Sequence, residues 1–243
     1  MKHLSLLLFS LLLAACGGGG GGGYAGPVAS TSTFQLKQAY ANNFNQTASQ
    51  TWTASGTAIV NGVTVQISGN GLTTQSAVTN TFYDGAPAQQ KSQTASGTLV
   101  VTDLGQSSSF PFPTTTVTLY VNQAFDPVGS STGGLFTFAT GPAAIPFTAR
   151  VGDAGHIGTF ETYGFQGQPV GPVLGRTSFS YSVEADTANT AILRISQTGT
   201  DAAGVVQITQ FEIFQITPEG SIVRLAGSAT VVGQSSATFT YYQ

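Results

Sequence analysis

Cysteine is almost absent from this sequence, and charged residues are rare. Among 243 residues, Cys16 is the only cysteine, and 7% of the residues are charged. A single cysteine excludes an intrachain disulfide. Because the chain also has only two histidines, a zinc or iron site would lack ligands. We therefore expect no metal and no cofactor, and a fold stabilised by a packed core, for which 41% hydrophobic residues are sufficient.

The few charges form no cluster of either sign. Seven basic and ten acidic residues are dispersed along the chain. A nucleic-acid binder needs a basic stripe, and binding to anionic lipids needs a polybasic patch. The sequence has neither, so we expect no nucleic-acid partner. A glycosidase-type pair of carboxylates remains open, although the sequence singles out no two of them.

Residues that favour helices, such as Lys, Glu and Met, are scarce, whereas β-branched and aromatic residues are common. From residue 50 onward, short alternating segments are separated by turn signals such as Asn61-Gly62. This pattern predicts an all-β chain with an antiparallel β-sandwich or a barrel-like β meander, as one body or as two packed β subdomains. Residues 34–44 fit a short helix about as well as a strand.

Alternation within the predicted strands assigns side chains to faces. Phe179 and Tyr181 share an apolar face, as do Leu193 and Ile195, with Arg194 pointing away. In a strand, successive side chains point to opposite faces of the sheet. The pattern therefore predicts strands with one buried, apolar face and one polar face.

The N-terminus has the pattern of an export signal. A short basic segment (1–3) is followed by a largely apolar run (4–13). The small residues Ala14 and Ala15 then precede Cys16. The apolar run is much shorter than the roughly 20 residues that a membrane-spanning helix needs. The sequence Leu-Ala-Ala-Cys that ends at Cys16 resembles the lipobox of bacterial lipoproteins.

This resemblance implies that the chain is cut between Ala15 and Cys16. In that class of proteins the cysteine carries a diacylglycerol thioether and usually a third acyl chain, so membrane lipid is the implied partner of Cys16. In that class the residue after the cysteine directs sorting between the two membranes. Aspartate at this position retains a protein at the inner membrane. Gly17 therefore implies export to the outer membrane. Two or more acyl chains anchor a protein stably.

Composition divides the chain into five parts. Seven consecutive glycines follow Cys16 and act as a flexible tether, which resembles the tethers of surface-displayed lipoproteins of Gram-negative bacteria. The predicted parts are a signal peptide (1–15), the lipidated cysteine with a Gly- and Ser-rich tether (16–33), an N-terminal β region (34–128), a Gly- and Pro-rich connector (129–145) and a C-terminal β region (146–243).

One segment matches a catalytic motif. Residues 129–133, Gly-Ser-Ser-Thr-Gly, fit the nucleophile-elbow pattern around Ser131, but the elbow needs a preceding strand and a following helix, and both flanks are typical of a loop. His156, with Asp153 and Glu161 near it in sequence, would also need an adjacent serine to form a triad. We therefore predict no catalytic residue and interpret His156 as a solvated turn residue.

Two further groups of residues are candidates for binding, one for calcium and one for a sugar or peptide. Asp186 and Asn189 offer too few oxygen ligands for calcium, and a hairpin turn accounts for both. Several aromatic residues suggest a platform for a sugar or peptide, although we interpret most of them as core. These aromatic residues are Tyr40, Phe44, Trp52, Phe110, Phe112, Tyr163 and Phe165.

Together these features predict an outer-membrane-anchored lipoprotein with a non-enzymatic binding or structural role at the cell envelope. It would face the periplasm or the cell surface, with an envelope protein or a glycan as its ligand. One alternative is an extracytoplasmic hydrolase that uses dispersed carboxylates or Ser131. The other is a transmembrane β-barrel, which needs outward apolar bands and a terminal aromatic residue, whereas this chain ends Tyr242-Gln243.

Overall fold

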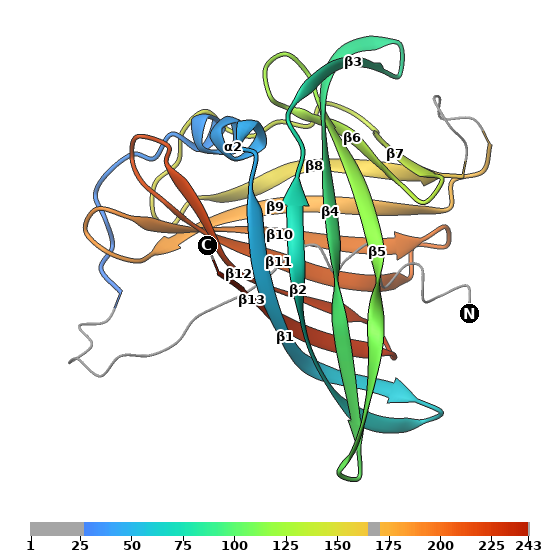
Figure 1. Ribbon diagram of the computed structural model, residues 1–243. Coiled ribbons are helices and arrows are strands. Elements are labelled where there is room, and N and C mark those ends of the chain that lie inside the picture. The colour runs from blue at the N-terminus through green and yellow to red at the C-terminus, as the bar shows by residue number, and fades with distance from the viewer. Residues whose placement is uncertain (1–26, 165–170, 243) are drawn as a thin grey trace.

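The computed structural model describes residues 27–164 and 171–242, and their strands form one antiparallel sheet. The sheet closes because β2 pairs with β4 as well as with β1, which gives a 12-stranded barrel with one additional strand (Figure 1). The prediction of an antiparallel all-β fold is confirmed, in its barrel form. The signal peptide, Cys16 and the glycine tether lie outside the described residues. The strands are β1 Ser49–Val60, β2 Val63–Gln75, β3 Thr79–Tyr83, β4 Ala86–Asp103, β5 Gln106–Val121, β6 Pro127–Thr132, β7 Leu135–Ala139, β8 Ala154–Tyr163, β9 Gly175–Ala185, β10 Ala191–Asp201, β11 Val206–Ile216, β12 Ile222–Val231 and β13 Ser235–Tyr242.

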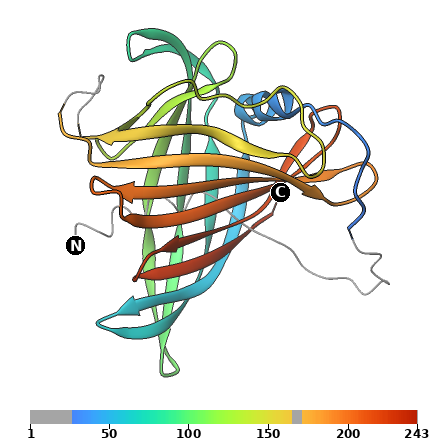
Figure 2. The same ribbon diagram turned by 180° about the vertical axis from the view of Figure 1, so that it is seen from behind.

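Except for β2 and β3, strands that follow one another in the chain are paired, and several of them are joined by short turns, as in a meander. Asn61 and Gly62 both have positive φ, 51° and 80°, which is the backbone that a two-residue hairpin turn of this sequence favours. On the far side of the barrel, β8 to β13 pair in chain order and form a continuous part of the wall (Figure 2).

The segment predicted as a connector, residues 129–145, contains β7 and most of β6. Gly133 and Gly134, with φ of 54° and 83°, form the turn between these two strands. The glycines therefore mark a hairpin within the sheet, and the two β regions expected on either side of the connector share one barrel.

The undecided segment 34–44 contains a helix, α2 (Leu36–Asn45), which lies across one end of the barrel (Figure 1). Its N-cap residue makes no side-chain capping bond, and no acidic residue in its first turn or basic residue in its last turn supports its dipole. Tertiary contacts must therefore stabilise it. Among the residues that the structure describes, no helix is long and apolar enough to cross a bilayer.

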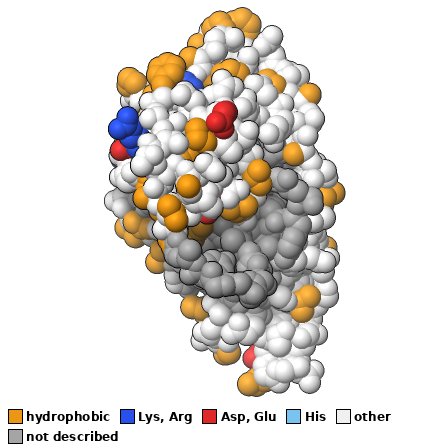
Figure 3. Space-filling view, turned by 90° about the vertical axis from the view of Figure 1, so that its left-hand side faces the viewer, with side chains coloured by type: hydrophobic (Ala, Val, Ile, Leu, Met, Phe, Trp, Pro, Cys, Tyr) orange, Lys and Arg blue, Asp and Glu red, His pale blue; other side chains and the backbone are white. Residues whose placement is uncertain are grey.

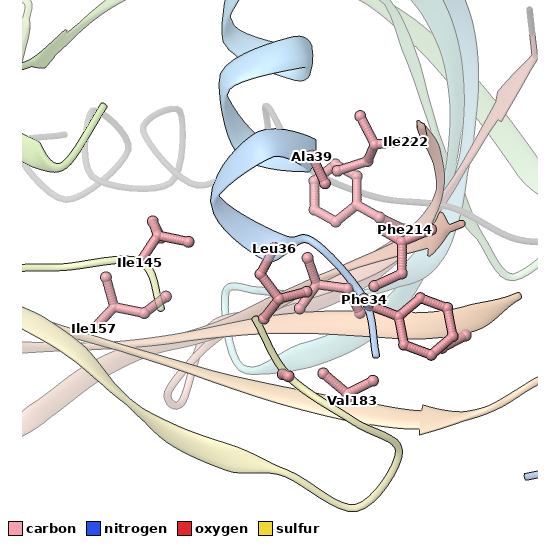
Figure 4. Close-up of a cluster of buried hydrophobic side chains, with 12 residues drawn as sticks. Phe34, Leu36, Ala39, Ile145, Ile157, Val183, Phe214 and Ile222 are labelled. Carbon is pink, nitrogen blue, oxygen red and sulfur yellow. The ribbon is translucent and has the colours of Figure 1, made fainter. Parts of the chain in front are cut away.

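An apolar cluster joins α2 to the barrel (Figure 4). Phe34 and Leu36 are almost fully buried and lie beside residues of β9 and β11, such as Val183 and Phe214. Burial of side chains of this size contributes about 1.5–3 kcal/mol each. The cluster comprises Phe34, Leu36, Ala39, Ile145, Ala149, Ile157, Val183, Ala191, Leu193, Phe214, Ile216 and Ile222.

The outer face of the barrel wall carries many hydroxyl groups. Neighbouring strands pair Ser92 Oγ with Thr118 Oγ1 at 3.0 Å and Thr94 Oγ1 with Thr116 Oγ1 at 2.9 Å. On the face in Figure 3, uncharged polar side chains and backbone predominate among the described residues, and charged side chains are few. Where β4 and β5 pair, hydroxyl groups and not charged side chains therefore meet on the outer face.

Candidate functional site: the barrel lumen

The interior of the barrel, here called the lumen, contains a cavity of about 220 Å³. α2 borders it at one end through Leu36, Tyr40 and Phe44. A cluster around Trp52 and Phe112, here called the aromatic plug, packs inside the barrel, and these two rings meet edge to face at 5.6 Å. The plug adjoins the cavity through Val117, which belongs to the cluster and also lines the cavity.

One wall of the cavity is apolar. It is formed by side chains of β8, β9 and β10, including Phe160, Tyr181 and Leu193. The predicted faces are confirmed here, because Phe179, Tyr181, Leu193 and Ile195 all line the cavity. Arg194 points away and pairs with Glu184 at 2.8 Å. Alternation along β9 and β10 thus places these apolar side chains inside the barrel and Arg194 outside.

Polar side chains also line the cavity, and most of them are deeply buried. Each of seven such residues is at most 8% exposed. Burial of polar and charged groups is costly unless they are paired, so a set of this size is a candidate functional feature. The seven residues are Lys91, Gln93, Thr137, Gln197, Gln210, Glu212 and Arg224.

Lys91 of β4 fixes the C-terminal end of α2 from inside the barrel. Its Nζ donates to the backbone carbonyls of Asn43, at 3.0 Å, and Gln46, and to Gln75 Oε1 at 2.6 Å. The last carbonyls of a helix lack intrahelical partners and carry partial negative charge. Lys91 thus supplies the cation that the last turn of α2 lacks.

Burial lowers the pKa of Lys91 from 10.5 to about 8, and nearby Arg224 adds to the effect. Between these two values the unfolded chain binds more protons than the native chain, so the free energy of unfolding rises with pH. We expect a rise of up to about 1.4 kcal/mol per pH unit from pH 8 to pH 10, measured by urea denaturation. Lys91→Met should lack this contribution, whereas Lys37→Met, which removes a lysine outside the cavity lining, should retain it. An equal pH dependence in native and Lys91→Met chains would contradict the assignment.

Glu212 and Arg224 form a buried ion pair on β11 and β12. Arg224 Nη2 lies 3.0 Å from Glu212 Oε1, and the side chains are 5% and 11% exposed respectively. The guanidinium of Arg224 also lies 5.7 Å from the centre of the Phe214 ring. Burial raises the pKa of Glu212 above its usual range, although Arg224 opposes this shift. The carboxylate therefore remains costly to ionise even beside its partner.

Two glutamines of the cavity lining bond to each other. Gln210 Nε2 donates to Gln197 Oε1 across neighbouring strands. Gln210 Oε1 is buried and has no hydrogen-bond partner. Native structures leave few buried polar atoms unsatisfied, so this oxygen marks a position where a molecule in the cavity would find an acceptor.

The cavity lining has an excess of positive charge. Among its described residues, Lys91 and Arg224 are basic and Glu212 is the one acidic residue. The apolar wall is contributed mainly by β8 to β10, while Lys91 comes from β4 and Arg224 from β12. The cavity is therefore amphipathic, with an apolar wall and a cationic polar side.

Comparisons with known proteins do not assign a family. No family model, curated protein or solved structure matches this chain. The function must therefore be inferred from the site itself.

The structure does not bring the predicted triad candidates together. Ser131 Oγ bonds to the Tyr120 hydroxyl, His156 Nε2 lies 3.3 Å from Thr159 Oγ1, and Asp153 accepts from the Arg150 backbone. Among the described residues, no hydrogen bond joins Ser131, His156 or Asp153 to another of the three. Residues 129–133 form most of β6 and the turn after it, so the helix that a nucleophile elbow needs does not follow.

The other candidate residues have structural contacts. Glu161 pairs with Arg176 at 2.7 Å and accepts from the Tyr163 hydroxyl. Asp186 accepts from Thr190 and Gln215 beside the turn that contains Asn189. Within residues 27–164 and 171–242, no group of acidic, histidine or cysteine residues is arranged to hold a metal ion.

The aromatic candidates are divided between several places. Tyr40 and Phe44 line the cavity, and burial together with the Glu212 carboxylate raises the pKa of Tyr40. Trp52 and Phe112 lie in the aromatic plug, and Tyr163 joins a separate cluster with Tyr83 and Phe138. Phe110 is 53% exposed, and Phe165 lies outside the described residues. No single aromatic platform forms among the described members of this set.

Sequence reasoning missed the polar lining of the cavity. The signal was present, because Gln210 and Glu212 occupy alternate positions between the buried Ile208 and Phe214 of β11. A polar residue at an inward position of a strand is a candidate interior group. Only the closed barrel shows that Lys91 and Arg224 come from other strands to the same cavity.

Proposed function

We propose that this protein is a binding protein anchored at the outer membrane, which holds a small, partly apolar molecule in its lumen. The cavity that α2 borders and the Trp52–Phe112 plug adjoins is the observation that supports this proposal. Ligand sites in proteins are concave and mostly apolar, with few convergent polar groups. The lumen has this composition, and the unpartnered Gln210 Oε1 lies in its wall.

The size of the cavity limits the ligand. An apolar cavity of about 150 Å³ accepts benzene, so a cavity of about 220 Å³ accommodates about nine non-hydrogen atoms at the same density. A single ring with a substituent or a medium-length alkyl chain fits this limit. A polypeptide or a glycan chain would exceed this volume. The ligand proposed for the cavity therefore differs from the envelope protein or glycan that the sequence analysis expects.

The hydroxyl-rich wall favours a barrel surrounded by water over the transmembrane alternative. A lipid-facing wall needs an outward apolar band, whereas the paired outward side chains of β4 and β5 are Ser92, Thr94, Thr116 and Thr118. In this proposal the acyl chains of Cys16 provide attachment. Residues 16–26 span at most about 40 Å when fully extended, so the barrel would remain close to the membrane.

The proposal is tested by filling the cavity. Ile195→Phe adds volume at a residue that lines it, and we expect the variant to lose binding of 1-octanol, measured by titration calorimetry on the unlipidated mature chain. The matched control is Ile192→Phe, because residue 192 lies on the opposite face of the same strand. Circular dichroism verifies folding of both variants. Equal 1-octanol binding by both variants, or a native chain that binds neither 1-octanol nor the other probes of the same size named below, would overturn the proposal.

A further inference from the structure

We propose that the ligand of the lumen is an amphipathic anion, whose negatively charged group lies at Lys91 and Arg224 and whose apolar body lies against β8, β9 and β10. This inference rests on the proposed function and adds the chemical class of the ligand. It is carried by the position of the two basic groups on one cavity and by the apolar wall of that same cavity.

Basic side chains outnumber acidic ones in the cavity lining. Lys91 is 3% exposed and Arg224 is 7% exposed, whereas Glu212 is the one acidic residue among the described cavity-lining residues. Interactions between charges are strong where water is excluded. An anion entering the lumen would balance the excess cation, whereas a cationic ligand would increase the repulsion between Lys91 and Arg224.

The bonding partners of Lys91 and Arg224 differ in charge. Lys91 is bound to neutral oxygens only, namely two backbone carbonyls and the Gln75 side chain. Charge-assisted hydrogen bonds to an ionised acceptor are stronger than bonds to neutral ones. An anionic group can therefore compete for Lys91 Nζ. Arg224 contributes positive charge while it remains paired with Glu212.

A ligand could reach the cavity beside the C-terminal end of α2. A surface hollow at the C-terminal end of α2 is lined by Asn42, Asn45, Gln46, Ser221 and Ile222. Ile222 also lines the cavity, and Gln46 is bound by Lys91. A ligand that enters beside α2 would thus meet Lys91 first. Competition for Lys91 would at the same time weaken its bonds to the end of α2, so α2 is the element expected to move during entry.

Three probes of equal size test the inference: heptanoate, 1-octanol and octylamine have the same number of non-hydrogen atoms. We expect heptanoate to bind the unlipidated mature chain at least about tenfold more tightly than 1-octanol near pH 7, because a hydrogen bond to a charged group is worth about one or two factors of ten. Octylamine should bind most weakly. Since heptanoate has the shorter alkyl chain, burial of apolar area alone predicts the opposite order.

Dependence on pH tests the role of Lys91 without a mutation. Because the pKa of Lys91 is lowered to about 8, heptanoate affinity should fall about tenfold or more between pH 7 and pH 10, while 1-octanol affinity stays level. Lys91→Met should remove the preference for heptanoate, and Lys91→Arg should retain it. If Lys91→Met fails to fold, the pH series on the native chain decides.

The possible outcomes separate the two proposals. Binding of 1-octanol as tightly as heptanoate, or a heptanoate affinity that does not change with pH, would overturn the anion inference and leave the binding function intact. No binding of any of the three probes would overturn the proposed function, and the inference with it.

Discussion

Replacing Cys16 by serine is expected to transfer the protein almost completely from the membrane fraction to the soluble fraction. A serine hydroxyl does not form the thioether that carries the acyl chains in the class that the N-terminus resembles. Each buried CH₂ of an acyl chain contributes about 0.8 kcal/mol to membrane binding. In the proposed function the acyl chains provide the attachment, so we expect their loss to release the barrel from the membrane.

The measurement is metabolic labelling with palmitate, followed by fractionation of washed membranes. The Gly17→Asp chain is the matched control, because it keeps Cys16 and changes only the residue that directs sorting. It should remain labelled and shift from the outer to the inner membrane. A Cys16→Ser chain that stays in washed membranes would favour the transmembrane alternative, and a native chain that takes up no palmitate would refute lipidation.

Removing the carboxylate of the lumen is expected to be the most destabilising single change inside the barrel. Glu212→Leu would leave the charges of Lys91 and Arg224 buried with no carboxylate lining the cavity. Breaking a buried ion pair from one side costs about 3–5 kcal/mol, because the remaining charge is uncompensated. We expect a loss of this size in the free energy of unfolding, measured by urea denaturation of the unlipidated mature chain.

Two comparisons isolate the electrostatic cause. The double variant Glu212→Leu/Arg224→Met removes both charges and should recover most of the lost stability, because apolar replacement of a whole buried pair is often neutral. Glu184→Leu breaks the pair with Arg194 on the outer face, where the side chains are 44% and 30% exposed, and should cost less than about 1 kcal/mol. Equal losses in Glu212→Leu and the double variant would show that packing, and not charge, is responsible.

The all-β class could be predicted because its cause is local. Alternation such as Phe179, Tyr181 and Val183 reports which side chains share a face, and Asn61-Gly62 reports a turn, with no knowledge of distant residues. Closure could not be predicted in the same way. It depends on pairing of the first strand, β1, with the last, β13, for instance between Trp52 and Tyr241, together with the pairing of β2 with β4.

The Gly- and Pro-rich segment shows the limit of reading composition. Glycine suits a flexible linker and a hairpin turn equally well, because its backbone adopts positive φ easily. Gly133 and Gly134 have positive φ and form the turn between β6 and β7. The pairing of β6 with β5 and of β7 with β8 decides between the two. A local composition is thus compatible with a boundary or with the middle of a sheet.

By itself, the sequence determined the strand-forming pattern, the shortage of metal ligands and the lipobox-like N-terminus from which anchoring is predicted, since each depends on residues that are adjacent in the chain. Only the tertiary structure decided that Lys91, Glu212 and Arg224 share one cavity and that α2 covers it. The reason is that Lys91 lies on β4, far in sequence from Glu212 and Arg224 on the paired strands β11 and β12. Only the closed barrel brings Lys91 into the same buried volume as that pair.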